Sequence, residues 1–495
     1  MYLVTSAQMR AIEERAINEL MIPSLLLMEN AALATVKHVM DLLAGRLSAA
    51  VVCGPGNNGG DGLAIARLLH VKGINVQVIF IGDVQKCTND AALNLQIIKK
   101  MGLLSEEPLH NILNCADVIV DAIFGTGLRG SLSGEAALAV KAINDCPASV
   151  VAVDIPSGVE ADTGKVSGTA VRADITVTFG LAKLGHMLYP GTEYAGRVIV
   201  EDISIPQNIL QGPYLEVLED ISGLLPPRPA RSNKGTYGRV CVLAGSKDMP
   251  GAAALCCKAA YRAGAGLVHA CVVPEVARII QISAHEVITS CALDPLNVKD
   301  AIDKADVIAI GPGMGRSPDV FAFVQEVLTV STKPMIIDAD ALMAIAADKS
   351  VLQKMKVPCI LTPHPGEMAA LTGTTIPQVL EDIVKCAQDF ARNYGVVTVL
   401  KDARTVIAAP NGQTFINPTG TPALAKAGSG DVLTGIIAAF MAQGCKNAPA
   451  AAAIGAYVHG KAGQLASENM SLYGVVAEDV AEYAGRVINT MSASL

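Results

Sequence analysis

The strongest constraint on the fold is a repeated pattern, in which a short apolar run ends near glycine or aspartate and a helical stretch follows. The run 49–53 precedes the sequence GPGNNGGDG, and an apolar stretch of helical character follows at 63–71. Strands that alternate with helices predict parallel sheets, because each crossover helix returns the chain over a face of the sheet. The sequence therefore predicts an α/β protein built from doubly wound, three-layer sheets.

The length of the chain and the distribution of this pattern predict two domains. At 495 residues the chain is too long for a single hydrophobic core. The pattern restarts after GLLPPRPARSNKG, a segment dense in Pro, Arg and Gly. We expect a first domain at 1–213, a linker at 214–235 and a second domain at 236–495. In the second half the predicted strands are 239–244, 267–273, 305–310, 334–337, 358–361 and 396–400.

Composition narrows the expected partners and compartment. The net charge of −8 comes without a basic stripe, so a nucleic-acid partner is not expected. No apolar run approaches the roughly 20 residues of a membrane span, and the amino terminus lacks the pattern of a secretory signal. The 12 cysteines include no CxxC pair, which favours reduced thiols in a cytoplasmic protein.

The glycine-rich stretch GPGNNGGDG has two interpretations. Gly54, Gly56 and Gly59 fit the spacing GxGxxG, which after a strand indicates a dinucleotide-binding turn and hence an NAD-dependent oxidoreductase. Asn58 and Asp61 stand among these glycines and supply oxygen atoms where a pyrophosphate prefers bare N–H groups. The glycines alone leave both interpretations open.

Carboxylates stand at the ends of two further predicted strands. Asp121 lies at the end of one apolar run and Asp154 directly follows the next. Such positions face the crevice where open α/β sheets bind ligands. Asn58, Asp121 and Ser157 together offer only oxygen ligands, which suits a hard cation rather than zinc. Taken singly, each aspartate is equally typical of a turn or a helix cap.

The main chemistry of the second half is expected in the stretch AKAGSGDVLTG at 425–435. Gly428, Ser429 and Gly430 precede an apolar helix and can point successive N–H groups at an anion. A carboxylate beside that anion is unfavourable unless it has a task, so Asp431 is interpreted as a base that takes a proton from a hydroxyl during phosphoryl transfer. The alternative is a plain helix start with Asp431 as its N-cap.

Other positions of the second half are candidates for ligand contacts. His364 lies between two prolines at a strand end, where a rigid loop can aim it at the crevice. Lys401 and Arg404 follow another strand and can reach phosphate oxygens, although a solvated turn is the alternative for Arg404. Small residues at the start of the helix at 251–263 leave room for a flat ligand.

These motifs together resemble those of bifunctional NAD(P)H-hydrate repair enzymes, and the resemblance covers nearly the whole chain. In the first half it rests on GPGNNGGDG, VDAIFGTGLRG, DIPSG and FGLAKLGHMLYPG. In the second half it rests on NKGTYGRVCVLAGS, GPGMG, TPHPGEM and AGSGDVLTG. The resemblance implies a Rossmann-like hydrate epimerase domain followed by a ribokinase-like, ADP-dependent hydrate dehydratase domain.

The resemblance also implies a function and a set of site residues. NADH or NADPH that has gained water on its nicotinamide ring exists as R and S hydrates. The first domain would interconvert them, and the second would dehydrate the S form with ADP, giving NAD(P)H, AMP and phosphate. The implied potassium ligands are Asn58, Asp121 and Ser157. The implied hydrate-binding residues of the first domain are Asn57, Asn58, Gly59, Gly60, Asp61, Gly125, Thr126, Gly127, Leu128, Arg129, Gly130, Ser131 and Asp154.

In the second domain the implied hydrate-binding residues are Ala252, Gly313, Gly315, His364 and Asp431. The implied nucleotide-binding residues are Lys401, Asp402, Ala403, Arg404, Thr405, Gly428, Ser429 and Gly430. Mg²⁺ is expected to accompany the nucleotide. The other expected partners are the small-molecule substrates and further copies of the chain.

The chemistry of the hydrate suggests a role for two aspartates. Its hydroxyl lies on a carbon next to the ring nitrogen, so the hydroxyl can leave as the nitrogen lone pair moves in. We expect Asp154 to act as general acid and then base in epimerisation, and Asp431 to deprotonate the hydroxyl in dehydration. Two alternatives remain open: a small-alcohol kinase in the second half, and a non-catalytic first half that has kept its fold.

Overall fold

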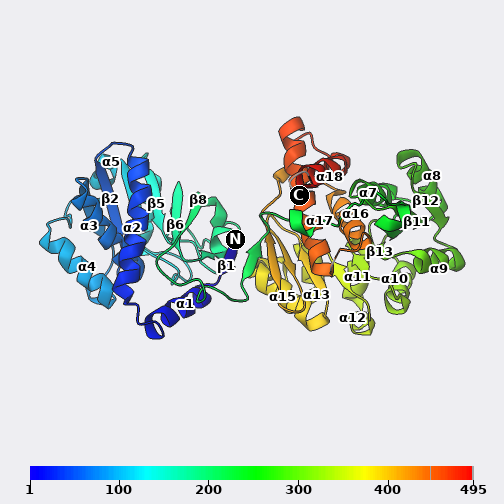
Figure 1. Ribbon diagram of the computed structural model, residues 1–495, viewed down its shortest axis with the longest axis horizontal. Helices are drawn as coiled ribbons and strands as arrows, with labels where there is room; N and C mark the ends of the chain where they lie inside the picture. Colours follow the sequence, from blue (N-terminus) through cyan, green and yellow to red (C-terminus); the bar gives the residue numbers. More distant parts are fainter. Residues whose placement is uncertain (446, 493–495) are drawn as a thin grey trace. The chain divides into compact units, whose positions relative to one another are not determined.

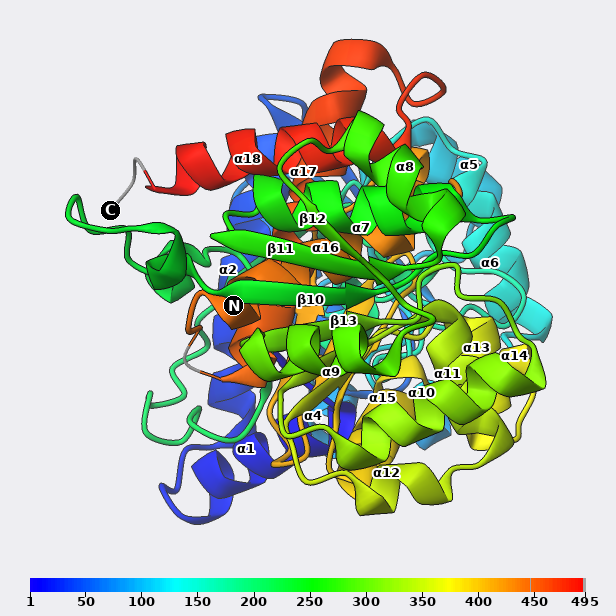
Figure 2. The ribbon, with the colours of Figure 1, turned by 90° about the vertical axis from the view of Figure 1, so that its right-hand side faces the viewer.

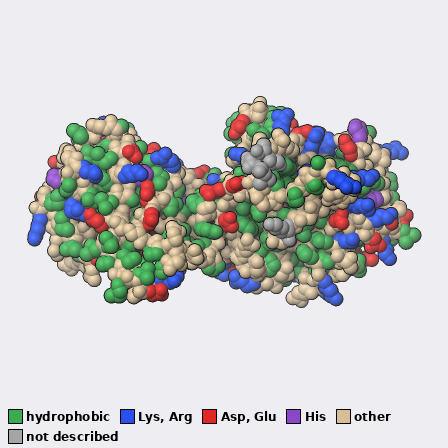
Figure 3. Space-filling model, in the orientation of Figure 1, with side chains coloured by type: hydrophobic (Ala, Val, Ile, Leu, Met, Phe, Trp, Pro, Cys, Tyr) green, Lys and Arg blue, Asp and Glu red, His purple; other side chains and the backbone are tan. Residues whose placement is uncertain are grey.

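The structure is a computed structural model that describes residues 1–445 and 447–492. The chain forms two compact units, Met1–Tyr214 and Leu215–Leu495, and each has its own sheet (Figure 1). No helix of the described part is long and apolar enough to cross a membrane. On the face shown in Figure 3, acidic and basic side chains are interspersed over the surface of both units.

The first unit is built on a six-stranded parallel sheet with the order β3-β2-β4-β5-β6-β8. Its strands are β2 (Ser48–Cys53), β3 (Asn75–Phe80), β4 (Val118–Ala122), β5 (Ser149–Val153), β6 (Ile175–Phe179) and β8 (Arg197–Glu201). Its helices are α1 (Ser6–Asn18), α2 (Ser24–Leu43), α3 (Asn57–Val71), α4 (Asn89–Lys100), α5 (Leu109–Cys115) and α6 (Gly134–Asn144). Buried apolar side chains of α2 and α3 pack on one face of the sheet and those of α5 and α6 on the other, which gives three layers.

The strand order of this unit locates its ligand crevice. The strand β3 lies on one side of β2 and the later strands lie on the other, so the topology switches direction between β2 and β4. This is the flavodoxin-like order rather than the order of the dinucleotide-binding fold, and ligands bind at the carboxyl ends of the strands that flank the switch. The start of α3 and the segments after β4 and β5 are therefore placed at the crevice.

A short parallel pair adds the amino-terminal segment to this unit. The strand β1 (Tyr2–Val4) pairs with β7 (Ala182–Lys183), and Val4 lies opposite Lys183. Thr5 caps α1, because its Oγ1 accepts a hydrogen bond from the backbone N–H of Gln8 at 3.2 Å. The start of α1 is thereby fixed beside β7.

The second unit contains a larger mixed sheet with the order β12-β11-β10-β13-β14-β15-β16-β17-β18-β9. Only β17 runs antiparallel to its neighbours among these described strands. The strands are β9 (Leu215–Val217), β10 (Arg239–Leu243), β11 (Leu267–Val272), β12 (Ile288–Cys291), β13 (Val307–Ile310), β14 (Met335–Ile337), β15 (Cys359–Leu361), β16 (Val397–Leu400), β17 (Thr405–Ala408) and β18 (Thr414–Asn417). The predicted fold class, two doubly wound α/β domains, is confirmed.

Helices cover both faces of this sheet (Figure 2). They are α7 (Pro250–Arg262), α8 (Pro274–Ser283), α9 (Pro295–Lys304), α10 (Pro318–Val330), α11 (Ala339–Ala347), α12 (Ser350–Lys354), α13 (Pro365–Thr372), α14 (Ile376–Glu381), α15 (Ile383–Tyr394), α16 (Ser429–Ala442), α17 (Ala448–Met470) and α18 (Ala477–Ser492). The helices α7, α16, α17 and α18 share one apolar core with the sheet. Proline begins α7, α8, α9 and α10, where its missing N–H would have no partner inside the helix.

Part of the predicted linker at 214–235 is packed into the second unit. Its strand β9 pairs with β18, and Leu218 and Ile221 are buried in the core of that unit. The high content of Pro, Arg and Gly in this segment did not indicate that part of it packs on the sheet. The few apolar residues that do so lie before the Pro-rich part. The division between the two units falls between Tyr214 and Leu215.

Candidate active sites

In the first unit, the glycine-rich stretch forms the turn between β2 and α3. The helix begins at Asn57, with Gly56 as its N-cap, so most of the predicted loop is helical. A Cβ atom on Gly54 would lie 2.1 Å from the carbonyl oxygen of Ile123, and one on Gly59 would lie 1.8 Å from that of Gly54. Both contacts involve backbone atoms, so these glycines permit the close approach of helix and strands. Packing therefore explains Gly54 and Gly59 without a dinucleotide, whereas Gly56 meets no described atom within 4 Å and is the N-cap of α3.

Asp121 at the end of β4 and Ser157 after β5 form a fully buried polar pair beside this turn. The Ser157 Oγ donates to Asp121 Oδ1 at 2.6 Å, and the Ser157 backbone N–H donates to Oδ2 at 2.8 Å. The Phe124 N–H donates to Ser157 Oγ at 2.9 Å. Burial raises the pKa of Asp121 to about 6, although the hydrogen bonds from Ser157 oppose this rise.

Asn58, the third expected cation ligand, lies in the same place. A Cβ atom on Gly125 would lie 3.2 Å from Asn58 Oδ1, and Gly125 directly follows Phe124. The Asn58 Nδ2 is buried and has no hydrogen-bond partner among the described residues. The structure thus places the amide oxygen of Asn58 beside the segment 124–125, which is hydrogen-bonded to Ser157.

Asp154 is paired with Lys183, a residue that the sequence did not single out. Lys183 is 1% exposed, and its Nζ donates to Asp154 Oδ1 at 2.5 Å and to Thr178 Oγ1 at 2.8 Å. The Thr178 hydroxyl also contacts Asp154 Oδ1, at 2.8 Å. Burial favours a raised pKa for Asp154, but the Lys183 ammonium and these hydrogen bonds outweigh burial and hold the pKa below its usual range. Asp154 is therefore a carboxylate at neutral pH, which argues against its expected role as the initial acid.

His186 supports the backbone of Asp154. Asp154 has a φ of +64°, in the left-handed region that residues with a side chain rarely adopt. The His186 Nδ1 accepts a hydrogen bond from the Lys183 N–H at 3.1 Å, so Nε2 carries the proton and donates to the Asp154 carbonyl at 2.9 Å. Burial and the Lys183 ammonium lower the pKa of His186 to about 4. A neutral histidine in this place orients Asp154 and does not exchange protons at neutral pH.

Two further carboxyl groups, Glu13 on α1 and Asp61 on α3, lie in the electrostatic field of Lys183 and Asp154. Burial is the main reason that the pKa of each is raised, and the Asp154 charge adds to the rise while Lys183 opposes it. The pKa of Asp61 lies well above its usual value. Two carboxyl groups of one site whose pKa values are shifted in opposite directions can serve as a proton donor and as an anion, respectively.

The loop 125–131 is fastened to the amino-terminal part of the unit. Arg129 Nη2 donates to Asp162 Oδ2 at 2.8 Å and to Ser6 Oγ at 2.9 Å. The Gly130 N–H donates to Glu160 Oε1 at 3.1 Å. Arg129, expected to bind the hydrate, is thus engaged with Asp162. The other residues of this loop, 126–128 and 131, are exposed or half-buried.

In the second unit the topological switch lies between β10 and β13. The helix α16 begins at Ser429, with Gly428 as N-cap at a φ of +89°. A Cβ atom on Gly428 would lie 2.6 Å from Leu255 Cδ1, so this position requires glycine for both conformation and space. Asp431 lies in the first turn and is not the N-cap, which removes the plain capping interpretation. The N–H of Ser429 donates to the Lys426 carbonyl at 3.3 Å, so the N–H groups of Gly428 and Gly430 are the candidates for the expected anion site.

A buried charge network adjoins Asp431. Asp338, the N-cap of α11, is 1% exposed. Its Oδ1 accepts from Lys401 Nζ at 2.9 Å and its Oδ2 from Thr434 Oγ1 at 2.8 Å. Lys401 Nζ lies 3.9 Å from Glu367 Oε2. Burial and then the Asp338 charge raise the pKa of Asp431 to about 7, against the Lys401 ammonium, which lowers it.

His364 is the N-cap of α13. Its Nδ1 accepts from the N–H groups of Gly366 at 3.0 Å and Glu367 at 3.3 Å, so its Nε2 carries the proton when the ring is neutral. Its side chain is 56% exposed, and its Nε2 lies 3.6 Å from Glu367 Oε1. The prediction that a rigid loop positions His364 at a strand end agrees with this geometry.

Gly313 and Gly315, two of the residues expected to contact the hydrate, follow β13. A Cβ atom on Gly313 would lie 2.8 Å from the Cβ of Ala252, so these two predicted residues are neighbours. The Gly315 N–H donates to Asp340 Oδ2 at 2.9 Å. Arg316 Nε donates to the other oxygen of Asp340 at 2.8 Å.

The predicted nucleotide residues 401–405 divide into two groups. A Cβ atom on Gly430 would lie 3.4 Å from Lys401 Nζ, so the ammonium is next to the anion site. Arg404 Nη1 instead donates to the carbonyl of Pro418 at 2.8 Å. Asp402 and Ala403 are exposed in the turn, and Thr405 begins β17.

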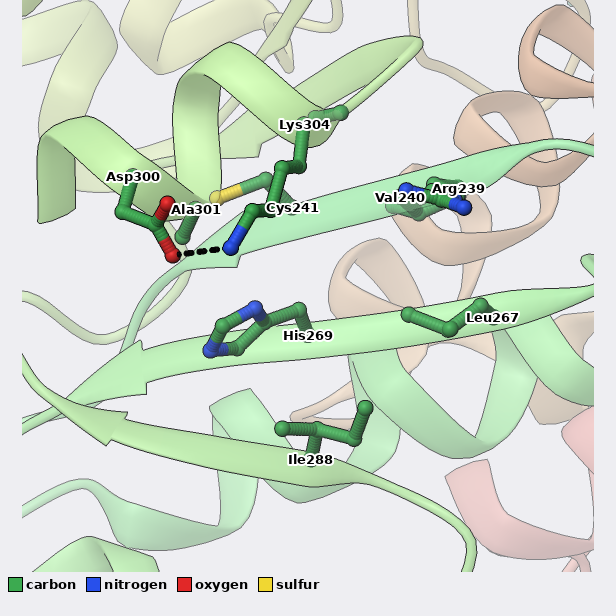
Figure 4. A pocket seen from close by; sticks show the side chains of 10 residues that line it. Arg239, Val240, Cys241, Leu267, His269, Ile288, Asp300, Ala301 and Lys304 are labelled. Atoms are coloured by element: carbon green, nitrogen blue, oxygen red, sulfur yellow. Dashed lines mark hydrogen bonds and ion pairs between the residues drawn. The ribbon is translucent and has the colours of Figure 1, made fainter. Parts of the chain in front are cut away.

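The structure also contains a groove that involves none of the predicted residues. It has a volume of about 250 Å³ and lies between α9 and the strands β10, β11 and β12 (Figure 4). Arg239 and Leu267, the first residues of their strands, line it, so the groove extends to the amino ends of β10 and β11. This is the edge opposite to the candidate site.

The structure adds Glu13, Lys183, His186, Asp338 and Glu367 to the residues around the two candidate sites. Asp338 obeys the same rule as Asp154, because it directly follows a strand, and that signal was available. Lys183 lies in the motif FGLAKLGHMLYPG, but nothing in that motif indicates its contact with Asp154. Glu13 lies on an ordinary amphipathic helix and carries no local signal.

Comparisons with known proteins identify the family to which each part of the chain is similar. Residues 240–486 match the family described as NAD(P)H-hydrate dehydratase, and residues 24–185 match the YjeF-related protein N-terminus. The chain is 43% identical over 518 aligned residues to the bifunctional NAD(P)H-hydrate repair enzyme Nnr of Moorella thermoacetica, covering 99% of this chain and 97% of that protein. It is 34% identical to the enzyme of the same name from Escherichia coli, over 89% of this chain and 84% of that protein.

A solved structure resembles the second unit. The crystal structure of the ADP/ATP-dependent NAD(P)H-hydrate dehydratase from Bacillus subtilis, crystallised with ATP and Mg²⁺, aligns with a TM-score of 0.51 at 34% identity. The alignment covers 56% of this chain and 99% of that one. Together with the matches over nearly the full length, this shows that the chain belongs to the bifunctional NAD(P)H-hydrate repair enzymes, which epimerise NAD(P)H hydrates and dehydrate them with the help of a nucleotide.

Proposed function

We propose that the dehydratase unit uses ADP as its phosphoryl donor and that Asp431 is the base. The observation that carries this proposal is the position of Asp431, in the first turn of α16 beside the N–H groups at 428–430. A pKa of about 7 keeps a sizeable fraction of this carboxyl ionised at neutral pH, while leaving it basic enough to take a proton.

The proposed reaction has two stages. Asp431 takes the proton of the hydrate hydroxyl, the hydroxyl oxygen attacks the β-phosphorus of ADP, and the bond to the AMP oxygen breaks. The N–H groups of Gly428 and Gly430 and the Lys401 ammonium stabilise the charge on the phosphoryl group in flight. The ring nitrogen lone pair then expels phosphate, and loss of a proton from the adjacent ring carbon restores the dihydropyridine. The oxygen of the added water leaves in the phosphate.

Mg²⁺ is proposed to enter with the nucleotide. The carboxylates nearest the anion site, Asp338 and Glu367, face Lys401, so they do not form a vacant metal cage. Mg²⁺ is commonly bound through phosphate oxygens and water with few protein ligands, which fits this arrangement.

Potassium is proposed to bind at Asn58, Asp121 and Ser157 in the first unit. The buried carboxylate of Asp121, the hydroxyl of Ser157 and the amide oxygen of Asn58 are hard oxygen donors of the kind that suits a monovalent cation. A bound cation would fix the loop 125–131 against the start of α3 and would favour the ionised form of Asp121. No proton transfer needs to pass through it.

For epimerisation we propose that Asp61 protonates the leaving hydroxyl and that Asp154 remains an anion. The Asp154 charge stabilises the planar ring cation that remains after water has left. Water then adds to either face of the ring, and the proton that it releases returns to Asp61. In this proposal the two roles belong to different residues. Asp61, whose pKa is raised, is the acid, and Asp154, whose pKa is lowered, is the anion.

We also infer that the chain associates with copies of itself. On α2 the side chains of Leu26 and Leu33 are each 48% exposed, and the adjacent Met21 is 79% exposed. Exposed apolar side chains gathered on one element favour a protein interface. Light scattering of the purified chain tests this inference, and a monomer at micromolar concentration would contradict it.

The nucleotide requirement is tested with purified S hydrate of NADH. Recovery of the reduced nicotinamide absorbance is followed with ADP, with ATP and without nucleotide, and ³¹P NMR identifies the products. Recovery with ADP that yields one AMP and one phosphate per NADH supports the proposal. Recovery that is faster with ATP contradicts the choice of donor, and a stable phosphate ester would identify a small-alcohol kinase instead.

A further inference from the structure

The charge network around Lys401 contains a carboxylate to which neither the sequence motifs nor the proposed chemistry assigns a task. Asp338 is fully enclosed, and its two oxygens accept hydrogen bonds from different elements. One donor is Lys401, which follows β16, and the other is Thr434 on α16. Asp338 thus joins the ammonium to the helix that carries the anion site.

The position of Asp338 relative to the anion site is defined by Gly430. A Cβ atom on Gly430 would lie 3.4 Å from Lys401 Nζ and 3.6 Å from Asp338 Oδ2. Gly430 directly precedes Asp431 in the first turn of α16. The buried carboxylate and the ammonium therefore both border the place where the phosphoryl group is proposed to bind.

We propose that Asp338 is a positioning residue of the dehydratase: it holds Lys401 at the anion site and, through its negative charge, keeps Asp431 basic. This inference rests on the proposed role of Asp431 as the base. A lysine free to move would pair with Asp431 and weaken it as a base, whereas Asp338 gives the ammonium a closer partner. The same contact places the ammonium for the phosphate oxygens of the nucleotide.

The other charged and titratable groups near Asp431 have been assigned partners or are neutral. Asp340 on α11 is paired with Arg316, and Glu367 on α13 accepts from the His364 N–H at 2.9 Å. Cys256 on α7 is fully buried, and burial raises its pKa far above neutrality, so the thiol carries no charge. His459 on α17, whose pKa burial lowers to about 4, is neutral as well and contacts the Ser429 carbonyl at 3.0 Å. Asp338 and Lys401 are therefore the charges that dominate at Asp431.

The direction of the expected effect follows from these charges. Burial, and then the Asp338 charge, raises the pKa of Asp431 to about 7, so the dehydration rate should rise with pH through this value. Asp338→Asn removes a like charge, so the rising part of the pH–rate profile, its acidic limb, should move to lower pH by about one unit. The ratio of the rate at pH 6 to that at pH 8 should then increase roughly fivefold, from about 0.1 to about 0.5.

The experiment measures initial dehydration rates of the S hydrate from pH 5 to 9, with ADP and hydrate well below their KM values, so that the free enzyme is reported. The titration of ADP itself affects every variant equally. The matched control is Asp348→Asn, because Asp348 is exposed at the other end of α11. A limb that moves down in Asp338→Asn and stays in place in Asp348→Asn supports the inference. An unmoved limb in Asp338→Asn overturns it.

A second variant covers the case in which Asp338→Asn does not fold. Thr434→Val keeps the shape and every charge but removes one of the two hydrogen bonds of Asp338. The KM for ADP should rise several-fold because Lys401 is held less firmly, while the pH limb should not move. An unchanged KM for ADP would overturn the positioning role.

Asp431→Asn distinguishes failure of the proposed base from failure of the positioning role. If Asp431→Asn turns over at the wild-type rate, the proposed base is wrong. If Asp431→Asn is inactive and the pH dependence of Asp338→Asn is unchanged, only the role of Asp338 is refuted.

Discussion

Replacing Lys183 with methionine should destabilise the first unit by removing the partner of a buried carboxylate. Lys183 is 1% exposed and the Asp154 side chain is 16% exposed, so water does little to replace the lost ammonium. Breaking a buried ion pair by removing one partner costs about 3–5 kcal/mol of unfolding free energy. For a unit of this size that corresponds to a decrease of about 10 °C in Tm.

The loss of stability should depend on pH in a defined direction. In the wild type the pKa of Asp154 is lowered on folding, so the pair contributes stability above the unfolded value of about 3.9, and this contribution is lost as the pH falls through the folded pKa. In Lys183→Met, the strongest opposition to burial is removed and the folded pKa of Asp154 rises, so the variant loses stability as the pH rises through that value. The difference between the two proteins should be small near pH 3 and largest at neutral pH.

Differential scanning calorimetry at several pH values measures this difference. The control is Lys141→Met, the same substitution at an exposed position on α6, which should leave the Tm unchanged within about 1 °C. The dehydratase rate at low temperature reports whether the second unit is intact. A Lys183→Met protein with wild-type stability at pH 7, or a loss of stability that does not vary with pH, would refute this reasoning.

Two further predictions concern the glycine turn and the cation pocket. Gly59→Ala should destabilise the first unit by about 3 kcal/mol or more in chemical denaturation, because its Cβ would lie 1.8 Å from the Gly54 carbonyl oxygen. The control is Gly56→Ala, whose Cβ would meet no atom within 4 Å and which should change stability by less than about 1 kcal/mol. Asp121→Asn should abolish the dependence of epimerisation on potassium, measured as the rate in potassium relative to tetramethylammonium chloride, and a dependence equal to that of the wild type would exclude Asp121 as a ligand.

The sequence predicted the architecture because strands that alternate with helices admit few topologies. It also placed Asp121 and Asp154 at the carboxyl ends of strands, where the structure has them, and their role as site residues remains a prediction. The start of α3 was placed too late. Glycines are poor helix formers, yet here close contact of the helix start with the Gly54 carbonyl and the strands outweighs their low propensity.

The partners of the site carboxylates could not be predicted from the sequence. Lys183 lies 29 residues from Asp154, and the two meet only because β7 continues past β6 toward the carboxyl end of β5. The lowered pKa of Asp154 depends on this contact, so the proposal that Asp154 remains an anion could be made only with the structure. Glu13 is a similar case, since its approach to Lys183 depends on the pairing of β1 with β7.

The central claim is that one chain holds two separable sites, and a mixture of R and S hydrates tests it most directly. Recovery of reduced nicotinamide is followed with ADP in potassium buffer for the wild type, Asp154→Asn and Asp431→Asn, each against an enzyme-free control. The wild type should recover the whole mixture. Asp154→Asn should slow sharply once the S form is consumed. Asp431→Asn should recover almost nothing, yet still interconvert the two hydrates on chromatography. A single variant that abolishes both epimerisation and dehydration while the protein remains folded would contradict the claim.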